Sequence, residues 1–447
     1  MGTDQVNAAE NAKREATLRN RVLKTSISTA VLAVATMAAS SAWATDGYFQ
    51  HGFGARQKAM GGAGVADGRD ATVLAINPAG LTTAGKSFEG AVSLFWPKRG
   101  YTGDGAGFPF AAAGTVDGND TELFAIPNVA YSTPIGGGNY FGISMYGNGG
   151  LNTDYENAPN PSCAFVPMAP LPSGVFCGGD TGVNLNQAFI AVGLAHDFGG
   201  FSLGVSPIFA LQQFEAKGLY VFAGLSSDPA HVTNNGTDTS IGGGVRVGFQ
   251  ANPIPTVRIG ASWQSKIWMG KFGDYAGLFA DGGDFDIPQT IQAGVSIDMT
   301  PNFTVNFDYR WINYESVNSV GNPFFPAPLG SADGPGFGWS NVNAYKVGGE
   351  YRLPGGGAIR AGYSHNNNPI GSDDVTLSLL APGTITDHIT GGFEFPLGAH
   401  QSIETAVMYA PKSTVAGPEI TSMGPSGQTI ELHLKEFEVT VGWKYRF

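Results

Sequence analysis

The last eleven residues constrain the fold of this chain more than any other segment. Apolar and aromatic residues occupy every odd position from Phe437 to Phe447, while polar, charged or small residues occupy the positions between them. Because successive side chains of a β-strand point to opposite faces, this pattern predicts a strand with one apolar and one polar face. The strand ends on aromatic residues, and this is unfavourable in water but typical of the aromatic girdles at a membrane interface.

The same two-residue period recurs along the chain and predicts fourteen strands. They are expected near residues 88–97, 126–134, 139–147, 184–198, 201–216, 240–251, 256–269, 288–299, 302–314, 341–353, 357–365, 386–396, 400–411 and 433–447. Short turns rich in Gly, Pro or Asn alternate with seven long polar loops, near residues 98–125, 148–183, 217–239, 270–287, 315–340, 366–385 and 412–432. The fold class predicted is therefore all-β, a 14-stranded antiparallel transmembrane β-barrel spanning residues 88–447.

The N-terminal 44 residues have the pattern of a secretory signal peptide. Five basic residues precede an apolar run from Ile27 to Ala39, and Ala42-Trp43-Ala44 follows as the cleavage site. A transmembrane helix is the alternative, but the run is shorter than the ~20 residues that a span requires. Removing residues 1–44 takes away five basic and three acidic residues, so the net charge changes from −12 to −14. An acidic chain argues against a nucleic-acid partner.

Residues 45–87 do not alternate, and they contain the motif Asn77-Pro78-Ala79 in a Gly-, Ala- and Asp-rich context. Here the chain resembles the FadL/TodX family of outer-membrane transporters. Further matches lie at residues 47–50, 63–66, 287–288, 345–353 and 360–363. The resemblance implies that residues 45–87 form a hatch inside the barrel lumen. A plug is also physically reasonable, because a fourteen-stranded barrel is too wide for its own side chains to fill. An ordinary disordered N-terminus is the alternative.

The resemblance also implies a function and a location. We expect passive uptake of hydrophobic molecules, long-chain fatty acids first, across the outer membrane of a Gram-negative bacterium, with release sideways into outer-membrane lipid. Uptake of aromatic hydrocarbons is the alternative within the family, and a structural or adhesive barrel is an alternative outside it. Phe447 resembles the C-terminal signature that barrel-assembly machinery recognises. We expect a monomer with no cofactor.

Two long loops carry apolar residues that a solvated loop would avoid. The residues expected to capture substrate are Leu219, Phe222, Leu225, Tyr275, Leu278 and Phe279. In the family the third and fourth outer loops form a capture groove, and an exposed apolar patch generally marks a binding site. Alternatively these residues pack against each other as a cap.

Several charged residues occupy the alternate strand positions whose side chains are expected to point into the lumen. Arg310, Lys346 or Arg360 could receive a substrate carboxylate through a charge-assisted hydrogen bond. Alternatively they belong to a network of ion pairs that lines the pore. The seven histidines show no metal-binding spacing, and no Ser/His pairing supports catalysis, so we expect neither a metal site nor an enzyme.

The third expected strand runs into a cluster of glycines. Gly142, Gly147, Gly149 and Gly150 weaken strand pairing and permit a bulge, although they could simply begin the long loop. The family resemblance implies an inward kink in this strand. We therefore expect the ladder to break in or beside residues 139–150 and to open the lumen laterally. Cys163 and Cys177 fall in one long loop and predict a disulfide in an oxidising compartment.

Overall fold

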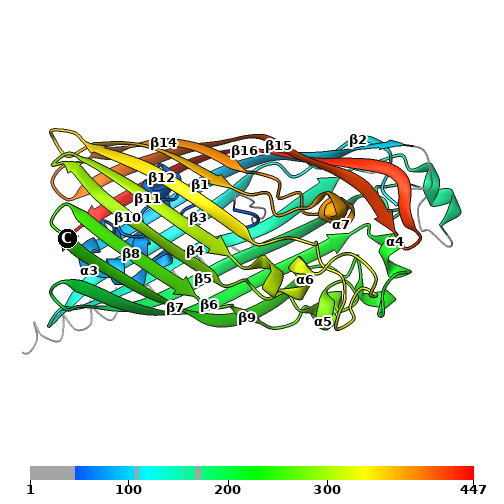
Figure 1. Ribbon diagram of the computed structural model, residues 1–447, viewed down its shortest axis with the longest axis horizontal. Coiled ribbons are helices and arrows are strands. Elements are labelled where there is room, and N and C mark those ends of the chain that lie inside the picture. The colour runs from blue at the N-terminus through cyan, green and yellow to red at the C-terminus, as the bar shows by residue number, and fades with distance from the viewer. Residues whose placement is uncertain (1–45, 106–109, 157, 167–172) are drawn as a thin grey trace, which may run out of the picture. The chain divides into compact units, whose positions relative to one another are not determined.

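The computed structural model describes residues 46–105, 110–156, 158–166 and 173–447. The expected signal peptide, residues 1–44, lies outside these ranges. The described residues form a closed antiparallel β-barrel of fourteen long strands, in which every residue of the first strand pairs with the last strand (Figure 1). This confirms the fold class predicted from the two-residue period.

The fourteen strands follow one another around the barrel in chain order. They are β1 Ser87–Gly105, β3 Phe124–Gly136, β4 Asn139–Tyr155, β5 Thr181–Asp197, β6 Phe201–Lys217, β7 Asp238–Ile254, β8 Val257–Gln264, β10 Thr290–Thr300, β11 Phe303–Ile312, β12 Val342–Arg352, β13 Ala358–Asn366, β14 Asp387–Pro396, β15 Gln401–Thr421 and β16 Gly424–Arg446. Two short strands lie off this path: β2 Gly114–Asp117 pairs with β1, and β9 Trp268–Met269 pairs with β7.

Short helices occupy the segment before β1 and the long loops. Those before β1 are α2 Gly54–Lys58, η1 Ala71–Ala75, η2 Pro78–Gly80 and α3 Leu81–Ala84. Those in the loops are η3 Pro161–Phe165, α4 Tyr220–Ala223, η4 Pro229–His231, η5 Gly273–Tyr275, α5 Ala280–Gly283, η6 Tyr314–Ser316, α6 Asn318–Gly321, η7 Ser372–Asp374 and α7 Val375–Ser378. No helix within the described ranges is long and apolar enough to cross a membrane.

The two ends of the barrel differ. Apart from the β15–β16 hairpin, the short turns lie with the C-terminus at one end, here called the turn end, and α4, α5, α6 and α7 lie at the other, the loop end (Figure 1). Between them the outer surface is apolar, with exposed side chains such as Ile291, Phe307, Phe393 and Val441. The alternation seen in the sequence thus places apolar groups outside and polar groups in the lumen.

One expected loop is not a loop. Residues 412–432 were predicted to connect two strands, but β15 and β16 continue to Thr421 and Gly424 and meet in a tight hairpin. The ladder persists through pairs such as Gly417 with Ile430. The prediction was wrong because the strand pairing extends past the part of the barrel that has an apolar outer face, so the alternation fades while the hydrogen bonds continue.

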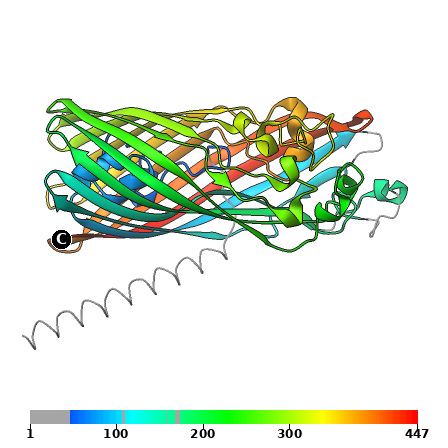
Figure 2. The ribbon, with the colours of Figure 1, turned by 90° about the horizontal axis from the view of Figure 1, so that it is seen from below.

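The described part of the hatch, residues 46–86, lies inside the barrel (Figure 2). Lumen-facing glycines on the surrounding strands make room for it. A Cβ at Gly204 would lie 2.4 Å from the Pro78 carbonyl carbon, and one at Gly260 would lie 2.6 Å from the Val65 carbonyl oxygen. Glycines facing the hatch in this way are Gly142, Gly193, Gly204, Gly248, Gly260, Gly348 and Gly362. Because glycine has no side chain, the hatch backbone can pack directly on the wall.

Buried ion pairs and hydrogen bonds join the hatch to β11 and β12 of the wall. Arg56 of α2 contacts Asp67 at 2.6 Å and Glu350 of β12 at 2.9 Å. Asp308 of β11 accepts hydrogen bonds from the Gly64 and Val65 backbone N–H groups at 2.9 and 2.8 Å. Removing one partner of a buried pair costs roughly 3–5 kcal/mol, so these contacts hold the hatch in a defined position.

Candidate functional site

The barrel wall is interrupted between β3 and β4. Their ladder runs from the pair Gly136–Asn139 to the pair Asn128–Tyr146 and has no further register within the described residues. Past Tyr146, β4 stays paired with β5 as far as Tyr155, and β3 stays paired with β1 as far as Phe124. The two neighbours therefore separate toward the loop end.

β4 bends where its glycines lie. The register with β5 shifts between Gly147 and Gly149, so Asn148 is an extra residue and forms a bulge. Residues 146–151 are all buried, whereas a strand lying in the wall exposes every second residue to the outside. This stretch has therefore turned toward the lumen. Gly142 lies elsewhere on β4 and faces the hatch, where a Cβ would lie 2.6 Å from the Leu81 side chain.

The tip of the hatch, residues 48–50, pairs with the bent part of β4. The Gln50 N–H donates to Asn148 O at 3.0 Å, and the Gly150 N–H donates to Tyr48 O at 3.1 Å. A Cβ at Gly149 would lie 2.0 Å from Tyr48 O, so only glycine permits this approach. Because buried backbone groups need partners, the hatch supplies hydrogen bonds that β3 no longer gives.

Arg99 of β1 spans the loop end of the break. Its guanidinium donates to the carbonyl oxygens of Asn152 on β4 at 2.7 Å and of Thr121, just before β3, at 2.8 Å. Arg99 is buried, and its guanidinium also donates to the side-chain oxygen of Asn152. The break is thus bounded on one side by the β3–β4 ladder and on the other by Arg99 and by the backbone bridge between Asn119 and Asp154.

The lumen wall next to the break is apolar, and the opposite wall is charged. The apolar side, on β4, β5 and β6, consists of Tyr146, Leu185, Phe189, Ile208, Ala210 and Phe214. The charged side, on β12 to β16, consists of Lys346, Glu350, Arg360, Glu394, Glu404, Glu436, Glu438 and Lys444. The alternation of residues along each strand predicted which charged side chains face the lumen. It did not predict the apolar side, because β5 and β6 carry apolar residues on both faces.

Aromatic rings line the apolar side up to the loops. Phe53 of the hatch lies 4.6 Å from the Tyr146 ring, and Tyr146 lies 5.7 Å from Phe189. Nearer the loop end, Phe214 lies 4.6 Å from the Phe279 ring. All of these residues belong to one buried apolar cluster. A hydrophobic molecule beside the break would therefore meet the rings of Tyr146 and Phe189 along the apolar side.

The three predicted carboxylate contacts are already paired. Arg310 and Lys346 share Asp46 of the hatch, at 3.2 and 2.8 Å. Arg360 contacts Glu350 at 2.8 Å and Glu404 at 3.2 Å. This geometry matches the ion-pair alternative, and a role in binding a substrate carboxylate stays a prediction.

Another buried cation, Arg246 of β7, was not predicted from the sequence. Its guanidinium donates to Tyr146 Oη at 3.0 Å and to Leu74 O of the hatch at 3.2 Å, and it also bonds the Gln264 side chain. Within the described ranges it has no carboxylate partner. Arg246 and Gln250 both occupy the alternate positions of β7 that face the lumen, and this alternation could have identified Arg246. Arg246 lies where the apolar side of the lumen meets the hatch and the break.

The motif Asn77-Pro78-Ala79 fixes the middle of the hatch. The Asn77 amide donates to Val65 O at 2.7 Å and to Phe249 O of β7 at 3.0 Å, while its carbonyl oxygen accepts from the Ala79 N–H at 3.0 Å. Pro78 opens η2, where its missing N–H costs nothing. The motif thus ties two hatch segments to the wall.

The expected capture residues lie inside the loop end instead of forming an exposed patch. Leu219, Phe222, Tyr275, Leu278 and Phe279 are buried, and Leu225 is partly buried. Their contacts include Phe222 with Phe176 at 4.6 Å and Tyr275 with Phe214 at 4.8 Å between ring centroids. Burial raises the pKa of Tyr275, whose neutral hydroxyl donates to Gly236 O at 2.5 Å. Their burial is compatible with the alternative expectation of a cap, and a role in capturing substrate stays a prediction.

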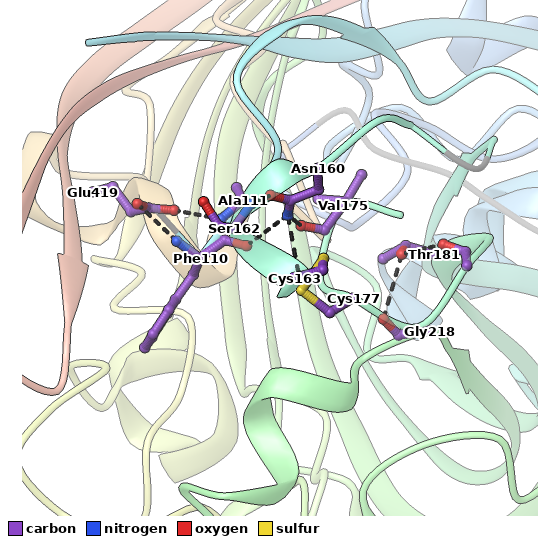
Figure 3. The surroundings of a disulfide bond; sticks show 11 residues. Phe110, Ala111, Asn160, Ser162, Cys163, Val175, Cys177, Thr181, Gly218 and Glu419 are labelled. Carbon is purple, nitrogen blue, oxygen red and sulfur yellow. Dashed lines mark hydrogen bonds between the residues drawn. A yellow bond between two sulfur atoms is a disulfide. The ribbon is translucent and has the colours of Figure 1, made fainter. Parts of the chain in front are cut away.

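The two cysteines form a disulfide, and a side-chain network surrounds it (Figure 3). The Asn160 amide donates to Val175 O at 3.1 Å, and Glu419 of β15 accepts from the Phe110 and Ala111 N–H groups at 3.1 and 2.7 Å. Cys163 and Cys177 therefore hold a loop that is also joined to the β15–β16 hairpin.

The C-terminal residue, Phe447, contacts Lys86. The Phe447 N–H donates to Lys86 O at 3.1 Å, and the Lys86 ammonium lies 4.6 Å from the Phe447 ring. This side chain is exposed at the turn end. Among the described residues no three His, Cys, Asp or Glu side chains are arranged to hold a metal ion.

Comparison with solved structures finds this fold in known proteins. A Pseudomonas aeruginosa FadL homologue matches with 16% identity and a TM-score of 0.66, covering 89% of this chain and 99% of that one. The toluene transporter TodX of P. putida matches with 15% identity and a TM-score of 0.65 over the same shares. The Ralstonia pickettii toluene transporter TbuX matches with 18% identity and a TM-score of 0.60, again over 89% and 99%. No family model matches the chain, and neither does any curated protein.

Proposed function

We propose that this protein lies in the outer membrane of a Gram-negative bacterium and lets hydrophobic molecules enter passively, releasing them sideways into the bilayer. The observation that carries the proposal is the break between β3 and β4, which lies beside the apolar side of the lumen. The apolar outer surface and the fold shared with a FadL homologue and toluene transporters support it. A signal peptide at residues 1–44, a monomeric barrel and recognition of Phe447 during assembly belong to the same proposal.

Sideways release follows from the energetics of apolar surface. A hydrocarbon that left the barrel through the turn end would expose its surface to water at about 25 cal/mol per Å². Passing between β3 and β4 avoids this cost, because the molecule moves from an apolar lumen wall to lipid. The charged side of the lumen offers no such path, because charged side chains such as Glu350 and Arg360 face it and are held in ion pairs with each other and with the hatch.

The bulge at Asn148 provides a direct test. Deleting Asn148 would restore continuous register between β4 and β5, because Gly147 and Gly149 already pair with consecutive residues of β5. We expect a folded barrel that has lost most hydrophobic uptake. The matched control is Asn148→Ser, which keeps the bulge. If the deletion variant transports at the wild-type rate with a straight β4, release between β3 and β4 is wrong.

Long-chain fatty acids are the substrates that we propose first, because of Arg246. Arg310 and Lys346 share the carboxylate of Asp46, whereas Arg246 has no carboxylate partner among the described residues. A fatty acid could place its carboxylate at Arg246 and its chain along the apolar side. Aromatic hydrocarbons are the second candidate, because Tyr146, Phe189 and Phe214 present rings without charge.

The two substrate classes can be separated in one variant. Arg246→Met should lower oleate uptake by about tenfold, the equivalent of one charge-assisted hydrogen bond of roughly 1.4 kcal/mol, and should leave toluene uptake unchanged. Equal loss for both substrates would indicate a structural defect. Unchanged uptake of both would remove Arg246 from substrate recognition and favour neutral hydrocarbons.

A further inference from the structure

Two histidines face each other where the hatch meets the wall. His51 directly follows the hatch tip, and His388 points into the lumen from β14, a strand that takes no part in the break. Their rings are stacked, with centroids 5.6 Å apart and planes 17° from parallel. Both side chains are buried, at 1% and 0% exposed. The two rings therefore form a closed contact between hatch and wall.

The surroundings of the two rings suit neutral imidazoles. His51 Nε2 lies 3.4 Å from Lys58 O, and its Nδ1 has no hydrogen-bond partner within the described residues. Neither ring nitrogen of His388 has a partner there. A protonated imidazole carries two N–H donors, so each charged ring would bury donors without acceptors, which is unfavourable.

The charged groups around the rings also oppose protonation. Lys58 of α2 and Lys346 of β12 lie near His51, and the Lys346 ammonium donates to His51 O at 3.0 Å. Three of the nearby carboxylates already have donors: Asp46 bonds Arg310 and Lys346, Glu438 bonds Lys58, and Asp387 bonds Thr386 and His365. The fourth, Glu436 of β16, has no hydrogen-bond partner in the part of the chain that the structure describes, and β15 separates its strand from β14.

Protonation therefore favours separation of the two rings. Burial lowers the pKa of His51 well below its ordinary value, and His388, Lys58 and Lys346 lower it further. In a displaced hatch tip His51 would be solvated, with a pKa of about 6.5. The displaced form thus binds the proton more readily, so the closed contact is fully favoured above about pH 6.5 and loses about a factor of ten for each pH unit below it. Two charged rings at this distance would also repel each other.

Displacing His51 would also change the break. Its neighbour Gln50 donates to Asn148 O of β4, and Tyr48 O accepts from the Gly150 N–H. These hydrogen bonds satisfy the bent part of β4, where β3 is no longer paired. A hatch tip that leaves the wall at His388 would therefore remove these partners from β4.

We propose that His51 and His388 form an acid-sensitive latch, which holds the hatch tip at neutral pH and releases it, with its hydrogen bonds to β4, when both rings are protonated. The inference rests on the proposed function in one respect, because the latch regulates substrate release only if the break is the exit. Release is local, since Arg56 and Asn77 anchor the hatch further along the chain. Asp46 still restrains the tip through Arg310 and Lys346, so the latch changes the population of the released form.

Hydrogen exchange of the full-length barrel at pH 7.5 and pH 5.5 tests the latch. Overlapping peptides report the Tyr48 and Gln50 amides of the hatch and the Gly150 amide of β4, and each rate is divided by the intrinsic rate at the same pH. With two rings that charge only after release, protection of these amides should fall about a hundredfold at pH 5.5. In His51→Gln and in His388→Gln it should fall about tenfold, and in the double variant it should not change, because glutamine takes up no proton.

His365→Gln is the matched control, since His365 is an exposed histidine of the neighbouring strand β13 and bonds Asp387 beside His388 at 2.9 Å. This variant should respond to pH as the wild type does. If the double variant keeps the wild-type response, or if Glu436→Gln abolishes it while both histidines are present, the histidines are not the latch. A response of the hatch amides without one at Gly150 would contradict the coupling to the break.

Toluene and oleate uptake at pH 7.5 is measured separately. If the wild-type protein takes up neither compound but shows the exchange pattern above, the latch stands and the uptake function is wrong. If uptake is normal and exchange is independent of pH, the latch is wrong and the uptake function stands. Heat-resistant migration on gels after incubation at each pH confirms that every variant is folded.

Discussion

Replacing Asn77 with alanine should loosen the hatch without opening the barrel. The Asn77 side chain makes three hydrogen bonds, to Val65 O, to Phe249 O and from the Ala79 N–H. All of these groups are enclosed between hatch and wall, so no water replaces the lost partner. The barrel strands keep their own ladder, because Asn77 takes no part in strand pairing.

The size of the effect can be worked from these contacts. At about 1 kcal/mol for each hydrogen bond, the substitution costs roughly 3 kcal/mol. This corresponds to an increase of about a hundredfold in the population in which the hatch segment around the motif is open. The ion pairs of Arg56 with Asp67 and Glu350 are untouched, so the hatch should stay in the lumen.

Hydrogen exchange followed by mass spectrometry measures this population directly. Peptides that cover residues 61–85 should exchange about a hundred times faster in the variant, and peptides from β16 should not change. Asn139→Ala is the control, since the Asn139 side chain is exposed at the start of β4, where it also makes three hydrogen bonds, to Gly136 O, to Gly137 O and with His196 Nδ1, but does not contact the hatch. Unchanged protection of residues 61–85, or equal loss in β16, would refute the role of Asn77 as the clamp of the hatch.

Three further outcomes are expected. Gly204→Ala places a Cβ 2.4 Å from the Pro78 carbonyl carbon, so the hatch must shift and small hydrophilic solutes should leak, whereas Gly391→Ala, whose Cβ would meet no atom closer than 3.6 Å, should show no leak in the same permeability assay. Replacing Cys163 and Cys177 with serine removes a constraint worth roughly 3 kcal/mol on their loop, and limited proteolysis should then cut this loop faster while the barrel keeps its heat-resistant migration. Deleting residues 46–85 should leave a folded but leaky barrel, and a barrel of unchanged solute permeability would contradict the plug.

Strand positions could be predicted from the sequence because a single physical rule sets them. Side chains alternate between an apolar exterior and a polar lumen, and this rule placed a strand at each of the fourteen sites in the barrel. The rule fails where its cause is absent. On the outer half of β15, residues such as Thr414 and Ala416 are exposed but face no apolar surroundings, so the pattern disappears although the strand continues.

Partners inside the lumen could not be predicted in the same way. Parity indicates that Arg310 and Lys346 point inward, but Asp46 pairs with them from 264 and 300 residues away. The loop residues show the same limit: Phe222 and Tyr275 read as exposed because the rings that cover them, Phe176 and Phe214, lie in other segments. Local sequence reports which face a residue occupies, and only the closed barrel determines what meets it there.

The hatch and the glycine-rich strand were separate expectations, and the structure makes them one feature. A ladder that ends early leaves backbone groups without partners, and such groups are costly in a place that excludes water. Here Asn148 O and the Gly150 N–H bond the hatch tip at Gln50 and Tyr48, so the wall is broken without this cost. The approach requires Gly149, because any side chain there would overlap Tyr48 O. The hatch tip therefore acts as a strand partner of β4, and the shape of the break depends on both segments.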